Sequence, residues 1–143
     1  MSAEDQPVFI DTNVLVYAHD ASGGAKAQRA REVVERLWET GGGCVSVQVL
    51  QEFFATVTRK VPHPLTARRA SRIIEDLAGW RVHAPQARDV LAAIEIHVHN
   101  RISFWDALIV RSALQLGCSE ILSEDLNPGP LAAGVSVRNP FAS

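Results

Sequence analysis

The sequence predicts an α/β fold of three layers, α/β/α, in which helices cover both faces of a mostly parallel sheet. Short apolar segments of strand length alternate with segments of helical periodicity. Several strand segments are apolar at successive positions. Because successive side chains of a strand point to opposite faces of the sheet, we expect helices to cover both faces of these strands. The length of 143 residues is usual for one domain, so we expect residues 1–143 to form a single domain.

Five segments have the length and composition of strands. The first is the apolar run from Val8 to Ile10, which stops at Asp11. The other four are Cys44–Val47, Arg81–His83, Glu120–Leu122 and Val135–Val137. The segment Asn127–Pro130 separates the last two and has the composition of a loop. We therefore expect a five-stranded sheet.

The helical segments carry their own start and stop signals. Apolar residues recur every three or four positions from Ala30 to Trp38, and three glycines from Gly41 onward end this helix. Thr66 and Ser103 are suitable N-caps for two later helices. The expected helical segments are Val14–Ala18, Ala30–Thr40, Leu50–Val57, Thr66–Gly79, Pro85–Asn100 and Phe104–Leu116.

The overall composition excludes several classes of protein. Fourteen Lys and Arg residues against 16 Asp and Glu residues give a formal net charge of -2, unlike a generally basic nucleic-acid binder. No apolar stretch approaches the roughly 20 residues that span a bilayer, and residues 1–5 contain no apolar signal segment. We expect a cytoplasmic protein. Cys44 and Cys118 are isolated, so we expect them to be reduced and buried.

Four acids that are far apart in the sequence are expected at one edge of the sheet. Asp11 ends the first strand, and Asp125 follows the fourth strand. Glu52 lies early in the helix that leaves the second strand, and Asp106 lies in the first turn of the helix before the fourth strand. Helices in both of these positions begin at the carboxyl edge of a parallel sheet, which is where α/β folds bind ligands.

Each acid also has a simpler interpretation. Asp11 can be a turn residue, Glu52 can be a solvated side chain, and Asp106 can favour a helix N-terminus. Asp125 can be a loop acid, and the neighbouring Glu124 can take its place. Together, however, the four carboxylates repel one another, by about 3 kcal/mol for two charges ~5 Å apart at an effective dielectric constant near 20.

This repulsion favours a bound cation. Carboxylate oxygens are hard ligands, and without histidine or cysteine among them they select Mg²⁺ or Mn²⁺ over zinc. Sites of this kind typically act on phosphate esters, because the metal ion activates water and stabilises the leaving oxygen. The four acids therefore predict a metal-dependent phosphodiester hydrolase.

The motifs around the four acids follow one another along essentially the whole chain. They are Phe9–Leu15, Gln51–Phe53, Ser103–Ile109 and Leu122–Leu126. This series resembles the acidic motifs of PIN-domain ribonucleases, and more narrowly those of VapC-type toxins of type II toxin-antitoxin modules.

The resemblance implies a PIN-like fold, cleavage of RNA with Mg²⁺ or Mn²⁺, dimerisation into a homodimer, and inhibition by a cognate antitoxin protein. It assigns the catalytic metal site to Asp11, Glu52, Asp106 and Asp125. Asn13 and Ser123 are polar neighbours that we expect to orient ligands or water.

Basic residues gather in residues 53–74, which hold five Lys and Arg and no acid. Within this stretch we expect Arg68, Arg69 and Arg72 to contact the RNA backbone, although a solvated helix face explains them equally well. Two other functions stay open. A haloacid dehalogenase-type phosphatase would have Asp where Asn13 stands, and a Lys after Arg101, where this chain has none. The other alternative is a non-catalytic RNA- or protein-binding module with the same fold.

Overall fold

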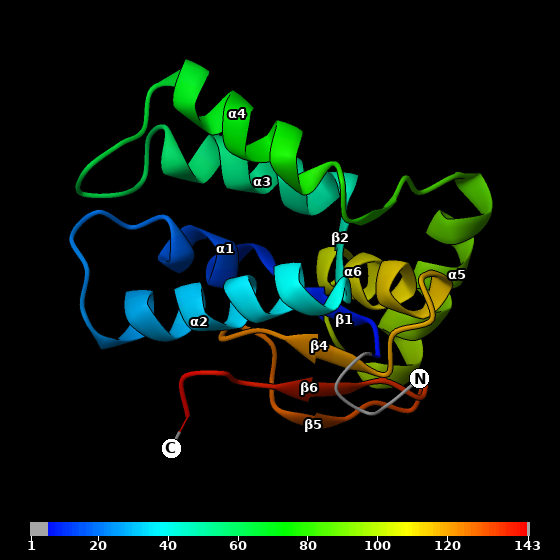
Figure 1. Ribbon diagram of the computed structural model, residues 1–143. Coiled ribbons are helices and arrows are strands. Elements are labelled where there is room, and N and C mark those ends of the chain that lie inside the picture. Colours follow the sequence, from blue (N-terminus) through cyan, green and yellow to red (C-terminus); the bar gives the residue numbers. More distant parts are fainter. Residues whose placement is uncertain (1–5, 143) are drawn as a thin grey trace.

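The computed structural model describes residues 6–142 and has the expected three-layer α/β/α architecture (Figure 1). Its strands form one six-stranded sheet in the order β3-β2-β1-β4-β6-β5. They are β1 (Val8–Ile10), β2 (Gly43–Ser46), β3 (Arg81–His83), β4 (Glu120–Leu122), β5 (Gly129–Pro130) and β6 (Ser136–Arg138). All neighbouring strands are parallel except β5 and β6, which are antiparallel. The predicted α/β fold with a mostly parallel sheet is confirmed.

The sheet has one strand more than the five expected. The additional strand, β5, lies in the segment that was expected to be a loop. Gly129 and Pro130 are poor strand formers, so their composition gives no strand signal. β5 is one of the two edge strands of the sheet, a position where proline is tolerated.

The helices lie on both faces of the sheet (Figure 1). They are α1 (Thr12–Ala18), α2 (Ala25–Thr40), α3 (Val47–Val57), α4 (Ala67–Leu77), α5 (Ala87–Asn100) and α6 (Phe104–Gln115). The connections through α1 to α4 step across the sheet in one direction, from β1 to β2 to β3, and the connection through α5 and α6 returns to β4. Right-handed crossovers therefore place α1 to α4 on one face and α5 and α6 on the other.

The boundary signals in the sequence act as expected. The side chains of Thr66 and Ser103 each accept a hydrogen bond from a backbone N–H in the first turn of α4 and α6, both at 3.1 Å. Gly41 ends α2 in the left-handed conformation, with φ 75°. Ser46 is the last residue of β2 and also the N-cap of α3, so the strand that we expect to run through Val47 stops one residue earlier.

The core lies between the sheet and its helices. Phe9, Leu15 and Phe53 are among the side chains that are completely buried. Cys44 and Cys118 are also buried and carry free thiols, as expected. Within residues 6–142 no helix is long and apolar enough to cross a membrane. The N-terminal segment that was expected to lack a signal sequence, residues 1–5, is outside the described residues.

Candidate active site

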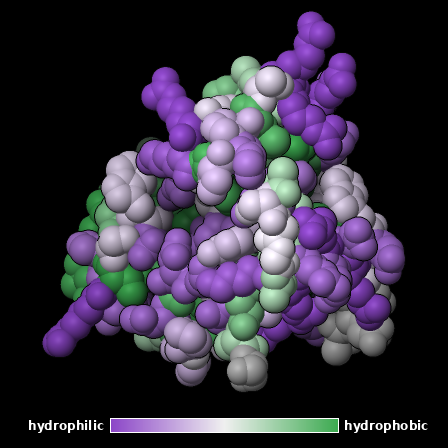
Figure 2. Space-filling view, turned by 90° about the vertical axis from the view of Figure 1, so that its left-hand side faces the viewer, coloured by the Kyte–Doolittle hydropathy of each residue, from purple (hydrophilic) through white to green (hydrophobic). Residues whose placement is uncertain are grey.

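The residues that follow β1 and β4 meet at the carboxyl edge of the sheet, on the left in Figure 1. Figure 2 looks onto this side of the molecule and shows a mostly hydrophilic surface. A cleft of about 340 Å³ opens here between α1, α3 and the loop after β4. It is lined by Thr12, Asn13, Val16, Tyr17, Glu52, Thr56, Glu124 and Asp125.

Asp11 is the buried acid at this edge, with an exposed fraction of 8%. Its Oδ1 accepts a hydrogen bond from the backbone N–H of Thr12, and its Oδ2 accepts one from the Ser123 hydroxyl, both at 2.8 Å. Burial raises the pKa of Asp11 to about 6, although these two hydrogen bonds act in the opposite direction. The negative charges of Glu52 and Asp125 also raise this pKa. A cation at this edge would therefore stabilise the charged form of Asp11.

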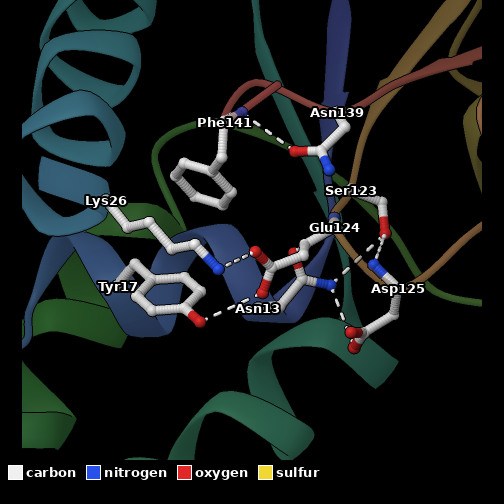
Figure 3. Close-up of polar contacts among 8 residues, drawn as sticks. All are labelled: Asn13, Tyr17, Lys26, Ser123, Glu124, Asp125, Asn139 and Phe141. Atoms are coloured by element: carbon white, nitrogen blue, oxygen red, sulfur yellow. Dashed lines mark hydrogen bonds and ion pairs between the residues drawn. The ribbon is translucent and has the colours of Figure 1, made fainter. Parts of the chain in front are cut away.

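Asn13 connects Asp11 to Asp125. Its Nδ2 donates to Asp11 Oδ2 at 3.2 Å and to Asp125 Oδ2 at 3.3 Å. The same amide group lies 3.3 Å from Ser123 Oγ, and Figure 3 shows Asn13 between the two acids of the loop, Glu124 and Asp125. Asn13 and Ser123, which were expected to orient ligands, hold the ends of β1 and β4 together.

Glu52 reaches this cluster from α3. Its Oε2 accepts a hydrogen bond from the Thr12 hydroxyl at 3.0 Å, and its Oε1 accepts one from Gln48 Nε2 at 2.8 Å. The Gln48 amide also donates to the backbone carbonyl of Trp105 at 3.3 Å. Trp105 directly precedes Asp106, whose carboxylate forms no hydrogen bond or ion pair with another of the described residues. Gln48 thus connects Glu52 to the start of α6, but among the described residues no contact joins the Asp106 carboxylate to the other three acids, and Asp106 does not line the cleft.

The structure distinguishes Glu124 from Asp125. The Glu124 carboxylate accepts a hydrogen bond from the Tyr17 hydroxyl at 3.0 Å and forms an ion pair with Lys26 (Figure 3). It is Asp125 that shares the Asn13 amide with Asp11. Of the two neighbouring acids, Asp125 is therefore the one that the hydrogen bonds group with Asp11.

Arg68, Arg69 and Arg72 lie on α4 and are exposed. Arg69 and Arg72 line a separate cavity of about 510 Å³ between α2 and α4, together with His19 and Trp38. None of the three arginines lines the cleft that holds the acids.

Sequence reasoning missed four residues that contact the acids. Gln48 stands one helical turn before Glu52, and this spacing is a signal that could have indicated the contact. Thr12 stands next to Asp11, but its contact with Glu52 depends on how α1 packs against α3. Tyr17 and Lys26 reach Glu124 through tertiary packing, for which the sequence carries no local signal.

The acids suit a hard divalent cation in their donor chemistry, since they offer only carboxylate oxygens. Within the described part of the chain, no group of three or more Asp, Glu, His or Cys side chains is close enough, as arranged, to hold a metal ion. Burial is the main cause of the raised pKa of Asp11, and the charges of Glu52 and Asp125 raise it further, so a cation would relieve their repulsion. By donor type and charge, the four acids fit Mg²⁺ or Mn²⁺.

The fold and the site together define a class: a PIN-like α/β domain with carboxylates at the carboxyl edge of a parallel sheet. The sequence matches the PIN domain family over residues 8–128, and the chain belongs to this family. Comparison with curated proteins finds no significantly similar sequence.

Several solved structures have the same fold. VapC20 from Mycobacterium tuberculosis, a sarcin-ricin loop cleaving toxin, is 25% identical over 82% of this chain and 91% of its own, with a TM-score of 0.62. A toxin-antitoxin complex from Klebsiella pneumoniae is 16% identical, covers 94% of this chain and 98% of its own, and has a TM-score of 0.68. VapBC2 from Rickettsia felis, bound to a promoter DNA fragment, is also 16% identical, covers 94% of this chain and 98% of its own, and has a TM-score of 0.64. The expected resemblance to PIN-domain proteins of the VapC type is confirmed.

Proposed function

We propose that the chain is a metal-dependent endoribonuclease and the toxin component of a type II toxin-antitoxin system. The observation that carries the proposal is the hydrogen-bonded set of Asp11, Asn13, Ser123 and Asp125, with Glu52 in the same cleft. The similarity to a toxin that cleaves the sarcin-ricin loop supports RNA as the substrate.

In the proposed site Asp11, Glu52, Asp106 and Asp125 hold Mg²⁺ or Mn²⁺ through their carboxylate oxygens. When bound, such a cation activates water for attack on the phosphodiester and stabilises the leaving oxygen. Asn13 orients the carboxylates of Asp11 and Asp125. The Ser123 hydroxyl donates a hydrogen bond that orients the carboxylate of Asp11. Thr12 and Gln48 orient the carboxylate of Glu52 in the same way.

Cleavage of an RNA pool tests this proposal. With Mg²⁺ or Mn²⁺ we expect cleavage by the wild type, and EDTA, Asp11→Asn or Asp106→Asn should lower the rate about 100-fold or more, since metal catalysis contributes several kcal/mol. Glu39→Gln, which neutralises an exposed acid on α2, is the matched control and should cleave normally. Cleavage that persists in EDTA or in both Asp variants contradicts the proposal. Binding of RNA or protein without any cleavage supports the non-catalytic alternative.

For RNA binding we propose contacts from Arg68, Arg69 and Arg72. Their three exposed side chains on one helix form a local positive patch in a chain whose net charge is -2. Replacing all three by Gln should weaken RNA binding across sequences and flatten its salt dependence, because fewer counterions are released. Arg88→Gln on α5 is the control. An unchanged affinity and salt slope contradicts these contacts.

For partners we propose a cognate antitoxin protein and a second copy of the chain. Structural similarity to toxin-antitoxin complexes supports the antitoxin. The dimer is supported by an apolar face on α5 and the start of α6, which a symmetric contact with the same face of a second copy would cover. Co-expression with the product of a short reading frame immediately upstream should abolish growth arrest by the proposed toxin. Growth arrest that persists contradicts this assignment of the antitoxin.

A further inference from the structure

Glu124, Lys26 and Tyr17 form a connected group beside the acids, and we infer that this group is a clamp that positions Asp125 for cation binding. The inference rests on the proposed metal-dependent function and assigns roles to residues outside the four acids. All three members act through the loop after β4, so they are positioning residues.

The clamp joins three elements that are distant in the sequence. Tyr17 lies in α1, Lys26 lies in the first turn of α2, and Glu124 follows β4. The Tyr17 hydroxyl donates to Glu124 Oε1, and the Lys26 ammonium group contacts Glu124 Oε2. Both oxygens of the carboxylate are therefore engaged on the side facing α1 and α2 (Figure 3).

Aromatic rings hold the Lys26 side chain in place. Its Nζ lies 5.3 Å from the centroid of the Tyr17 ring and 5.7 Å from that of the Phe141 ring. The two rings contact each other edge to face, with their centroids 5.0 Å apart. An exposed ion pair contributes little when its side chains are free to move. The rings and the Tyr17 hydroxyl restrict this freedom, so the Lys26–Glu124 pair can fix the loop.

The backbone of Glu124 passes this restraint to Asp125. Its N–H donates to Asn13 Oδ1 at 2.9 Å, which makes the Nδ2 end of the Asn13 amide face the acids. That end donates to Asp125 Oδ2 at 3.3 Å. Asp125 is exposed, and this is its side chain's one hydrogen bond to the described residues. The position of the Asp125 carboxylate therefore depends on the loop and on Asn13.

The clamp also balances a charge. Without the Lys26 ammonium, the Glu124 carboxylate would stand uncompensated next to Asp125 in the chain, within a cleft already lined by Glu52. Like charges at this distance repel. Losing Lys26 should therefore both release the loop and push the neighbouring carboxylates apart.

Mn²⁺ binding, measured by electron paramagnetic resonance of the free ion, gives a readout that does not depend on cleavage. Lys26→Met should weaken Mn²⁺ affinity about tenfold, as is typical when residues that orient metal ligands are lost. It should lower kcat for RNA cleavage and leave KM near the wild-type value. Lys26→Arg preserves the charge and should preserve the affinity. Lys60→Met, at an exposed position three residues after α3, is the matched control.

A double-mutant cycle with Glu124→Gln tests whether the two residues act together. If they do, Lys26→Met combined with Glu124→Gln should be no worse than the more severe single variant. Tyr17→Phe removes one hydrogen bond and provides a milder variant should Lys26→Met fail to fold, as judged by circular dichroism. It should weaken Mn²⁺ binding less than Lys26→Met does.

The possible failures are distinguishable. If the wild type binds no Mn²⁺, the proposed function and the clamp are both overturned. If the wild type binds Mn²⁺ and Lys26→Met binds it equally well, the clamp alone is overturned. A raised KM with unchanged Mn²⁺ affinity would make Lys26 an RNA contact and also overturns the clamp, as do additive effects of Lys26→Met and Glu124→Gln.

Discussion

Gly43 shows how a missing side chain can determine packing in this fold. A Cβ atom at this position would lie 2.5 Å from two atoms of the Trp80 ring, closer than packed atoms come. Trp80 is buried and packs against Trp38, with the ring centroids 5.3 Å apart. The indole ring of Trp80 can therefore lie on the backbone of β2 because position 43 is glycine.

We expect Gly43→Ala to lower the free energy of unfolding by about 1–3 kcal/mol, the usual cost of overpacking a core. Urea denaturation measures this cost. Replacing Trp80 by Leu also destabilises the core, but the smaller side chain should leave room for the new methyl group. The double variant should therefore cost less than the sum of the two single variants, and additive costs would contradict the clash.

Asp11 carries an electrostatic cost when no cation is present. Burial disfavours its charged form, and Glu52 and Asp125 add to the effect. In EDTA we expect Asp11→Asn to stabilise the protein by about 1 kcal/mol, because the desolvation cost disappears while part of the hydrogen bonding is lost. Mn²⁺ should raise the melting temperature of the wild type more than that of the variant. Equal shifts in thermal melts would show that Asp11 is not a ligand.

Among the secondary-structure elements, β3, α5 and α6 are joined by one buried carboxylate. Asp89, with an exposed fraction of 1%, accepts hydrogen bonds from Arg111 Nε at 2.9 Å and from the backbone N–H of Gln86 at 2.8 Å. His83 Nε2 lies 3.3 Å from the same carboxylate, and His83 Nδ1 lies 2.7 Å from Ser112 Oγ. Ser112 is completely buried, so this Ser-His-Asp series connects elements and presents no accessible nucleophile to a substrate.

The hydrogen bond from Gln86, with further help from Arg111 and His83, holds the pKa of Asp89 below its ordinary value. A carboxylate whose pKa is lower in the folded state stabilises the protein at neutral pH, and this contribution is lost as the pH falls through its folded pKa. Asp89→Asn should therefore cost about 2 kcal/mol at pH 7 and progressively less below pH ~4, measured by urea denaturation across pH. Glu39→Gln, the control, should have the same stability as the wild type across this pH range. A cost that stays constant down to low pH would contradict a role for the charge.

How far the elements could be predicted depended on how local their signals are. The helices have apolar periodicity and caps such as Thr66 and Ser103, and the sequence located them well. β5 has neither signal, since its two residues form a strand only because β6 lies beside them. The network around Asp89 was also unpredictable, because its members come from three elements.

For the candidate site, the order of strands and helices predicted the positions of the acids better than local sequence patterns did. Asp11 and Asp125 follow parallel strands, so their common edge follows from the order of the elements. Sequence could not decide between Glu124 and Asp125. That choice depends on Tyr17 and Lys26, which reach the loop only once α1 and α2 are packed.

On the scale of the whole molecule, the surface carries exposed apolar side chains outside the cleft that Glu52 and Asp125 line. Among residues 6–142, five of the seven large exposed hydrophobic side chains lie on α5 or at the start of α6. We call them the α5 face: Val90, Leu91, Ile94, Val98 and Trp105. Three of them, Leu91, Val98 and Trp105, have exposed fractions of 64–65%. Leu91, Ile94 and Val98 follow one another at spacings of three and four residues and so share one side of α5, and exposed apolar side chains grouped in this way indicate an interaction surface.

A symmetric dimer would use the α5 face twice, so a single substitution introduces two changes into the interface. We expect the wild type to dimerise and Leu91→Glu or Val98→Glu to be monomeric in light scattering, because burying an unpaired carboxylate costs several kcal/mol. Since both side chains are exposed, the monomers should keep the wild-type circular dichroism spectrum. Ala78→Glu, at an exposed position after α4, is the control and should stay dimeric. A wild type that is monomeric at all concentrations, or glutamate variants that still dimerise, would contradict the proposed dimer. If the dimer is contradicted and the glutamate variants fail to bind the antitoxin, the α5 face binds the antitoxin instead.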